Sequence, residues 1–196
     1  MDIDRPLVRK RIEECRQGLG MVKAWKVSGR NSFIQLYFEG LRINFYLPTP
    51  DDTVESPPHT HDLGLTSTVL YGSFVNNILE VEDDPKGDYE RLVLHRPDAL
   101  TFKYSKTGQR CRIVSETPTL YEAGDTYSMD PREYHTTLFE EPTITYMRRW
   151  QEERIPTYHL VEPGRKVPSI PDRTISKDEF PGIWRTLDEM CERAGI

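Results

Sequence analysis

The alternation of apolar and polar residues predicts a long β-rich region in the middle of this chain. Between residues 21 and 158, short runs rich in Val, Ile, Leu, Tyr and Phe alternate with polar residues. Turn-forming pairs separate these runs, among them residues 39–40, 107–108 and 124–125. Many short strands with regular turns and no helical pattern between them are typical of an all-β sandwich or barrel. We therefore predict an all-β fold, with a hairpin at 39–40 and a turn at 107–108.

Both ends of the chain carry a helical pattern instead. Residues 4–19 place apolar side chains on one helix face, namely Leu7, Ile12 and Cys15. Residues 176–195 carry a longer apolar stripe, made of Phe180, Ile183, Trp184, Leu187 and Met190. Gly195 provides a stop for this second helix. The proline-rich residues 162–176 before it predict an extended strap over the barrel.

Length and composition predict a single domain over residues 1–196. A chain of 196 residues with 36% hydrophobic and 10% aromatic residues can build one core. We place the barrel core at about 21–160 and the C-terminal strap and helix at 161–196. Cys15, Cys111 and Cys191 are far apart and form no CxxC pair, so we expect three reduced thiols.

Charge and hydropathy narrow the range of partners. The net charge of −6 and the pI near 5.5 argue against nucleic acid as a partner. No run approaches the 18 apolar residues that a membrane span needs, and the first residues lack the apolar stretch of a secretory signal. We therefore expect a cytoplasmic protein with a small-molecule substrate, without a nucleic-acid or membrane partner.

Two of the five histidines form a His-x-His pair at the start of the β-rich region. Residues two apart on a strand point to the same face, so His59 and His61 can bind one cation together. Pro57 and Pro58 stiffen the approach and remove two backbone donors, which suits the start of an edge strand. This pair is the first candidate metal site.

The spacing around this pair resembles the two motifs of the cupin superfamily. His59 and His61 are followed after ten residues by Gly72, as in the first motif. Gly124 and His135 stand at the separation of the glycine and histidine of the second motif. Other motif positions depart from the pattern, and they are Thr53, Asp130 and Arg132. The resemblance implies a single cupin jelly-roll β-barrel in which His59, His61 and His135 bind a metal.

The ligand set that the resemblance implies has no carboxylate, because Leu65 stands at the glutamate position of the first motif. Within the superfamily this is most similar to the cysteine dioxygenase-like thiol dioxygenases, which hold Fe(II) with three histidines. In that group an Arg-Asn element like the one at Arg30 holds the substrate carboxylate, and a tyrosine precedes the last ligand as Tyr127 does here. The resemblance therefore implies catalytic roles for Arg30 and Tyr127.

One departure from that group changes the expected substrate. Its Ser-x-His-x-Tyr relay would fall on Thr145, Met147 and Arg149, so the histidine and the tyrosine are missing. Cysteine itself is therefore not the expected substrate, although Arg149 could act on an acidic one.

Several residues near the motifs are alternatives for roles in the site. Glu133 is two residues before His135 and is an alternative carboxylate ligand or a support for a ligand. Tyr134 is an alternative to Tyr127 as the hydroxyl donor. His95 and His159 have no paired spacing, and we leave both outside the predicted site.

These observations together predict a metal-dependent dioxygenase of a small anionic or thiol-containing molecule, with O2 as co-substrate. Fe(II) is the expected metal, and Zn, Mn or Ni are the alternatives. The same scaffold also hosts non-oxidative enzymes (isomerases, lyases and hydrolases) and non-catalytic ligand-binding cupins. The resemblance further implies a homodimer. The two terminal helices are too short and too acidic for a DNA-binding helix-turn-helix.

Overall fold

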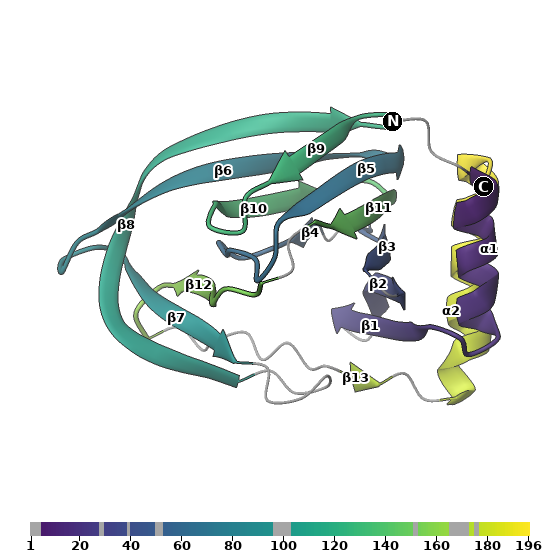
Figure 1. Cartoon of the computed structure of the whole chain (residues 1–196), viewed down its shortest axis with the longest axis horizontal. Helices are drawn as coiled ribbons and strands as arrows, with labels where there is room; N and C mark the ends of the chain where they lie inside the picture. The colour runs from purple at the N-terminus through teal and green to yellow at the C-terminus, as the bar shows by residue number, and fades with distance from the viewer. Residues whose placement is uncertain are drawn as a thin grey trace.

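The computed structural model describes residues 5–27, 30–38, 40–49, 53–95, 103–150, 153–164, 173–174 and 177–196. In this part of the chain, strands form two antiparallel sheets, and a helix lies near either end of the sequence (Figure 1). The predicted strap falls mostly at 165–172 and 175–176, outside the described residues.

The first sheet has seven strands. In spatial order they are β13 (Arg173–Thr174), β1 (Met21–Val27), β2 (Arg30–Phe38), β3 (Leu41–Tyr46), β11 (Thr143–Arg149), β5 (Leu65–Tyr71) and β9 (Thr126–Met129). The predicted hairpin at 39–40 joins β2 to β3, where Gly40 has a φ of 68°. Such a positive φ favours glycine, which explains why the hairpin signal was readable from the sequence.

The second sheet has six strands. Their spatial order is β12 (Thr157–Val161), β7 (Tyr89–His95), β8 (Lys103–Glu122), β6 (Ser73–Asp83), β10 (Tyr134–Phe139) and β4 (Val54–Glu55). This sheet is strongly curved, and its long strand β8 bends between its two partners β6 and β7 (Figure 1).

The connections between the two sheets are those of a jelly roll, the architecture that cupins share. Eight strands form two interleaved sets, with the order β3-β11-β5-β9 in one sheet and β4-β10-β6-β8 in the other. From β3 to β11 the chain changes sheet at every connection except those from β6 to β7 and from β7 to β8. The predicted all-β jelly-roll barrel with an N-terminal and a C-terminal helix is confirmed.

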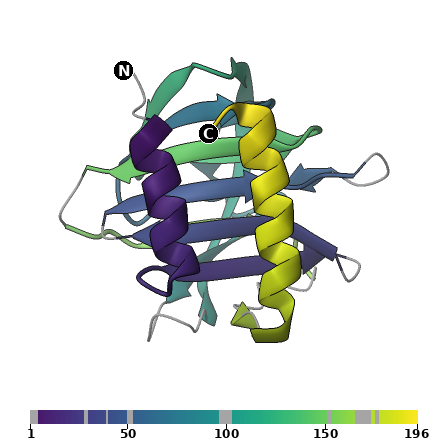
Figure 2. The same ribbon diagram turned by 90° about the vertical axis from the view of Figure 1, so that its right-hand side faces the viewer.

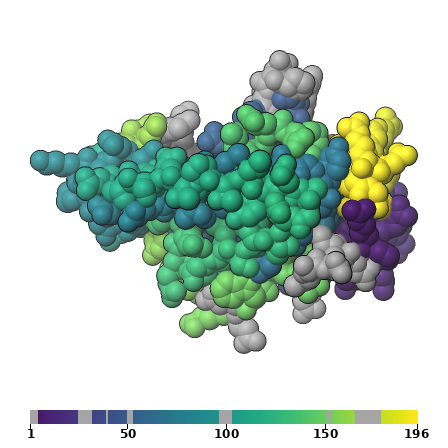
Figure 3. All heavy atoms as spheres, turned by 90° about the horizontal axis from the view of Figure 1, so that it is seen from above, coloured from purple at the N-terminus to yellow at the C-terminus, as the bar shows by residue number. Residues whose placement is uncertain are grey.

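Strand β8 corrects one prediction. The turn predicted at 107–108 is wrong, because β8 continues unbroken through these residues for 20 positions. Gly108 has a φ of 79°, and the Thr107 hydroxyl donates to the carbonyl of Arg91 at 2.8 Å. The ladder with β7 shifts register here, so the glycine makes a bulge that bends the strand. Beyond the bend β8 pairs with β6, and the two strands run together along one face (Figure 3).

The two helices cover the outer face of the seven-stranded sheet, where they lie side by side (Figure 2). They are α1 (Arg5–Arg16) and α2 (Phe180–Ala194), the latter preceded by the short helix η1 (Lys177–Glu179). The apolar faces pack together into the main core, in which Val8, Ile12, Ile183 and Leu187 meet Ile34, Leu36, Ile43 and Phe45. Gly195 ends α2 with a φ of 67°, as predicted.

Strand β3 shows why the inner face of this sheet is polar. Ile43 and Phe45 face the helices and are fully buried, so the alternate residues Arg42 and Asn44 face the interior. The Asn44 amide donates to the Thr145 hydroxyl and accepts from Gln35, both at 2.9 Å. A row of hydrogen-bonded polar side chains therefore crosses the inside of the sheet.

Both helices fall short of the length and apolar character that crossing a membrane requires, within the residues described.

Candidate metal centre

The segment that carries the His-x-His pair closes the six-stranded sheet. The backbones of His59 and His135 exchange two N–H···O bonds of 3.0 Å, which ties the segment to β10. On its other side, the amide of Thr60 donates to the carbonyl of Tyr158 in β12 at 2.9 Å. The two prolines predicted the start of an edge strand. This prediction is wrong, because the segment lies between two strands. Both backbone ladders hold the histidine pair in place.

Three histidines converge at this closure. The potential ligand nitrogens of His59, His61 and His135 all lie within 4.8 Å of one another. The Nε2 atoms of His61 and His135 are 2.9 Å apart. Two nitrogens about 2.1 Å from one ion and at right angles to each other would be about 3.0 Å apart. The spacing of this pair therefore suits two neighbouring ligands of one ion.

Hydrogen bonds orient two of the three rings. The Nδ1 atom of His135 lies 2.7 Å from the Oδ1 atom of Asn76, and that of His59 lies 2.8 Å from the carbonyl oxygen of Pro57. Each Nδ1 carries the proton because its partner is an acceptor. The Nε2 lone pair of each ring is then directed away from these partners, as in histidines that bind a metal.

The surroundings keep all three rings neutral. The pKa of His59 is lowered to about 4, mainly by burial; the bond to Pro57 opposes the shift, and the positive charge of Arg42 adds to it. Burial also lowers the pKa of His61 and His135 well below the usual value, and the neighbouring histidines add to the effect. Neutral imidazoles offer lone pairs to a metal without first losing a proton. The donor set therefore fits a divalent transition metal.

The nearby carboxylates lie away from this group. Glu133 is exposed, and its Oε2 atom accepts a 2.7 Å bond from the amide of Asp130 within a turn. Asp62 pairs with Arg154 at 3.5 Å. Within the described residues, the group of potential ligands contains histidines alone. The arrangement with Glu133 as a ligand is thus not the one present.

The predicted anion-binding residues have different outcomes. Arg30 begins β2, but its side chain lies outside the described part, so its role stays a prediction. Arg149 is half-buried, and its charge contributes to the low pKa of His61. The sequence reasoning missed Arg42, whose charge lowers the pKa of both His59 and His61. The alternation of apolar and polar residues in β3 could have predicted that Arg42 lies on the polar inner face.

The two candidate tyrosines face opposite ways. Tyr127 is opposite Ser67 in the ladder of β5 and β9 and packs on the inner cluster of Leu65, Met129 and Met147. Burial raises the pKa of Tyr127 to about 12. Tyr134 lies on the other face of β10, where the Arg91 guanidinium stacks 5.9 Å from its ring centre. Of the two, only Tyr127 faces the interior between the sheets, where it packs near Ile78, the residue opposite His135.

A fourth histidine, which the sequence reasoning left out, lies behind the group. His159 is 7% exposed, and its ring stacks on that of His59 with centroids 5.3 Å apart. Tyr104 contacts the edge of His159 at 5.1 Å. His95 is exposed and bonds to Ser105 at 2.6 Å, so its exclusion agrees with its position. The position of His159 could not be predicted from its spacing to the other histidines. It depends on the backbone hydrogen bonds that place β12 beside residues 58–60.

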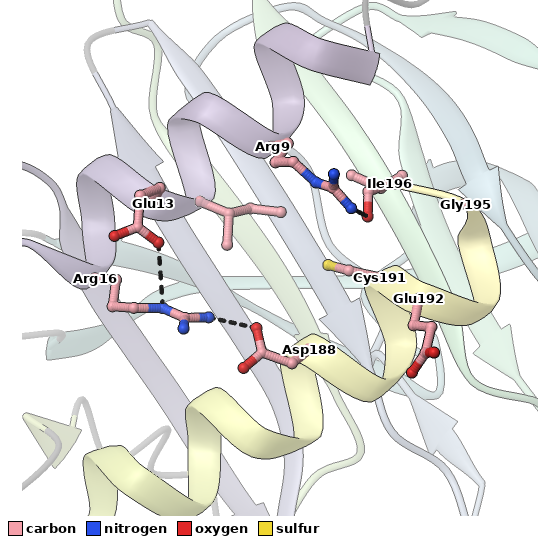
Figure 4. Close-up of a pocket in the computed structure, with 9 residues that line it drawn as sticks. Arg9, Glu13, Arg16, Asp188, Cys191, Glu192, Gly195 and Ile196 are labelled. Carbon is pink, nitrogen blue, oxygen red and sulfur yellow. Dashed lines mark hydrogen bonds and ion pairs between the residues drawn. The ribbon is translucent and has the colours of Figure 1, made fainter.

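Two hollows on the surface lie on faces other than the one that the three histidines share. One of about 700 Å³ lies between α1 and α2, where the Arg9 guanidinium donates to the carbonyl of Ile196 at 2.7 Å (Figure 4). The seven-stranded sheet separates it from the histidines. Another of about 500 Å³ is lined by Asn77 and Thr136, on the face of β6 and β10 opposite to Asn76 and His135.

Comparison with known proteins gives weak likenesses to solved structures alone. No protein-family model and no curated protein matches the sequence. The structure of Fe(II) HppE is 9% identical and aligns over 67% of this chain and 56% of that chain, with a TM-score of 0.41. The chain thus spans little more than half the length of HppE.

Two further structures show the same level of likeness. The Drosophila melanogaster CENP-C cupin domain is 10% identical over 76% of this chain and 100% of that chain, with a TM-score of 0.35. Hydroquinone 1,2-dioxygenase PnpCD in complex with Cd2+ and 4-hydroxybenzonitrile is 12% identical over 59% and 61%, with a TM-score of 0.31. At these scores the assignment of the jelly roll depends on the strand order, and the function depends on the site.

Proposed function

We propose that this protein is an Fe(II)-dependent dioxygenase that acts on a small anionic or thiol-containing molecule. The observation that carries the proposal is the convergence of three neutral imidazoles, His59, His61 and His135, without a carboxylate among them. Three neutral ligands leave a divalent ion with its full double charge and with open positions. Such a centre attracts anionic substrates more strongly than one that already holds a carboxylate.

When bound, Fe(II) would supply the redox chemistry by which O2 oxidises a substrate held beside it. The chain itself provides orientation and a dry environment. Leu65, Met129 and Met147 form an apolar cluster on the inner face beside Tyr127. This cluster would exclude water from the substrate.

Two further residues would act on the substrate. With a pKa near 12, Tyr127 keeps its hydroxyl proton at neutral pH and can donate a hydrogen bond. Arg30 would hold a substrate carboxylate with its two parallel donors, a role that the motif resemblance implies. Both roles require that the substrate lies between the histidines and the inner face of the seven-stranded sheet.

The proposal is tested by loading the chain with Fe(II) under anaerobic conditions, measuring bound iron, and following O2 uptake with small thiols and small acids. We expect one iron per chain and O2 uptake with at least one substrate. His135→Ala should abolish both, whereas His95→Ala, which changes an exposed histidine outside the group, should change neither.

Full iron loading with no O2 uptake on any thiol or acid would contradict the dioxygenase proposal. Turnover that persists without O2 and follows Zn, Mn or Ni would instead support a non-oxidative metal enzyme on the same three ligands. A ligand-binding function that survives His59→Ala and His135→Ala would support a non-catalytic role.

A further inference from the structure

Arg42 carries a charge that no carboxylate among the described residues balances. Its Nε atom is buried without a hydrogen-bond partner, and its Nη2 atom contacts the Met147 sulfur at 2.6 Å. A thioether is a weak acceptor and carries no charge. In the described part of the chain, no carboxylate lies within ion-pair distance of this guanidinium. A partly buried cation in this position lacks a counter-ion.

A second cation shares an aromatic ring with Arg42. The guanidinium carbon lies 5.8 Å from the centre of the Tyr37 ring, and the Lys23 ammonium lies 5.3 Å from the same centre. Lys23 is 8% exposed. The ring attracts each cation, but two positive charges around one ring also repel each other. Both charges would attract a negatively charged ligand at this position.

The pairing of strands connects these cations to the candidate metal centre. Tyr37, Arg42 and Met147 are directly opposite one another on β2, β3 and β11, and the same row continues through Ser67 to Tyr127. Met147 also lies in the apolar cluster that contacts Ile78, and Ile78 is directly opposite His135 in the ladder of β6 and β10. The cations and the histidines thus face one interior.

Strands β1 and β2 carry Lys23 and Tyr37, and both strands lie outside the eight strands of the jelly roll. They extend the seven-stranded sheet beyond β3 and add cationic surface to its inner face. Lys23 and Tyr37 therefore belong to strands that this chain adds to the eight-stranded barrel. The two cations differ from the clamp predicted at Arg30, because Lys23 lies on β1 and Arg42 on β3, whereas Arg30 begins β2.

We propose that Lys23, Tyr37 and Arg42 form an anion subsite, and that the substrate is a small molecule with two anionic groups. One group would lie at the metal centre, and the other would lie between Arg42 and Lys23, beside the edge of the Tyr37 ring. The Arg42 fork suits a carboxylate, which it meets with two parallel hydrogen bonds. Only one part of this inference rests on the proposed function, namely that one anionic group of the substrate lies at the metal centre.

The test compares two acids that differ in one carboxylate. Glutarate has two carboxylates, and butyrate has one. Calorimetric titration of the Fe(II)-loaded chain without O2 should show at least tenfold tighter binding of glutarate. Loss of a charge-assisted bidentate contact weakens binding by about ten- to a hundredfold. Arg42→Gln should therefore reduce the preference to within about threefold, while bound iron stays unchanged.

A control variant and a conservative variant accompany this test. Arg148→Gln removes an exposed arginine from the opposite face of β11 and should keep the full preference. Arg42→Lys keeps the charge but lacks the fork, and should lower the preference partway. If Arg42→Gln does not fold, as judged by circular dichroism, an unchanged preference in Arg42→Lys overturns the subsite.

The outcomes separate this inference from the proposed function. A folded, iron-loaded Arg42→Gln that keeps the full preference overturns the subsite, as does a wild-type chain that binds neither acid. If the chain binds no iron, the proposed function fails. Titration of the metal-free chain then decides the subsite, because Arg42→Gln should still weaken glutarate binding about tenfold, and an unchanged affinity overturns it.

Discussion

The ring of His159 lies on the ring of His59, with planes 22° apart and centroids separated by 5.3 Å. The ring of His59 also contacts that of His135, whose ring centroid is 4.4 Å away. A ligand that contacts two rings and is bonded through Nδ1 to Pro57 has little freedom to turn. His159 is therefore a positioning residue for the metal centre, although it is not among the three potential ligands.

Replacing His159 by alanine should lower the affinity for Fe(II) by about tenfold, because His59 would lose the surface against which it stacks. His159→Phe keeps an aromatic ring in this place and should retain most of the affinity. Competition with a chromophoric chelator measures both values. Equal affinities for wild type and His159→Ala would show that the stacking has no part in metal binding.

Asn76 fixes the proton of His135 on Nδ1, so its loss should weaken the centre without removing a ligand. Partners of this kind contribute about ten- to a hundredfold to metal affinity. We expect Asn76→Leu to lower Fe(II) affinity in this range. The matched control is Asn77→Leu, because Asn77 lies on the opposite face of β6 and bonds to Thr136. A loss of the same size in both variants would argue against the role of Asn76.

The metal-free protein should lose stability when the pH falls from about 7 to 5. The pKa of His59 is about 4 in the folded chain against 6.5 for an ordinary histidine. Between these values the unfolded chain binds a proton that the folded chain does not, so stability falls with pH. For His59 alone the loss between pH 7 and 5 is roughly 2 kcal/mol, and His61 and His135 shift in the same direction.

Urea unfolding of the metal-free chain at pH 7, 6 and 5 measures this loss. This window lies above the range in which most carboxylates titrate. His59→Gln should flatten the dependence, whereas His95→Ala should leave it unchanged. A free energy of unfolding that stays level from pH 7 to 5 would mean that the three rings are not buried in neutral form.

Gly72 is a position where the fold requires glycine. Its φ is 74°, and an added Cβ would lie 2.3 Å from the carbonyl oxygen of Pro142. Gly72→Ala should destabilise the protein by about 2 kcal/mol or more, measured by urea unfolding. Gly124 has a φ of 102° but open space around it, so Gly124→Ala should cost about 1 kcal/mol. Equal costs would show that the approach of Pro142 is not the cause.

Local sequence patterns were sufficient for most of the elements, because each depends on neighbours in the chain. The helix face of α1 illustrates the remaining error: Val8 is buried with Ile12 and Cys15, while the predicted Leu7 is half-buried. Thr107 and Gly108 are residue types that are common in turns, and a bulge in a long strand uses the same types. The pattern therefore could not tell one from the other.

The spacing of the two motifs was sufficient to predict the three histidines of the candidate site, but not the residues around them. His59, His61 and His135 were found from their separations along the chain. His159 and Arg42 were missed because their positions depend on which distant strands pair. The closure of β12 against residues 57–61, and the inward register of β3, are properties of the assembled sheets.

The most direct test of the metal centre is a crystal of the Fe(II)-loaded chain, grown without O2, with anomalous diffraction measured at the iron edge. We predict one anomalous peak, about 2.1 Å from a ring nitrogen of each of His59, His61 and His135. A peak bound by other residues, or a fully iron-treated crystal without a peak between these rings, would contradict the account.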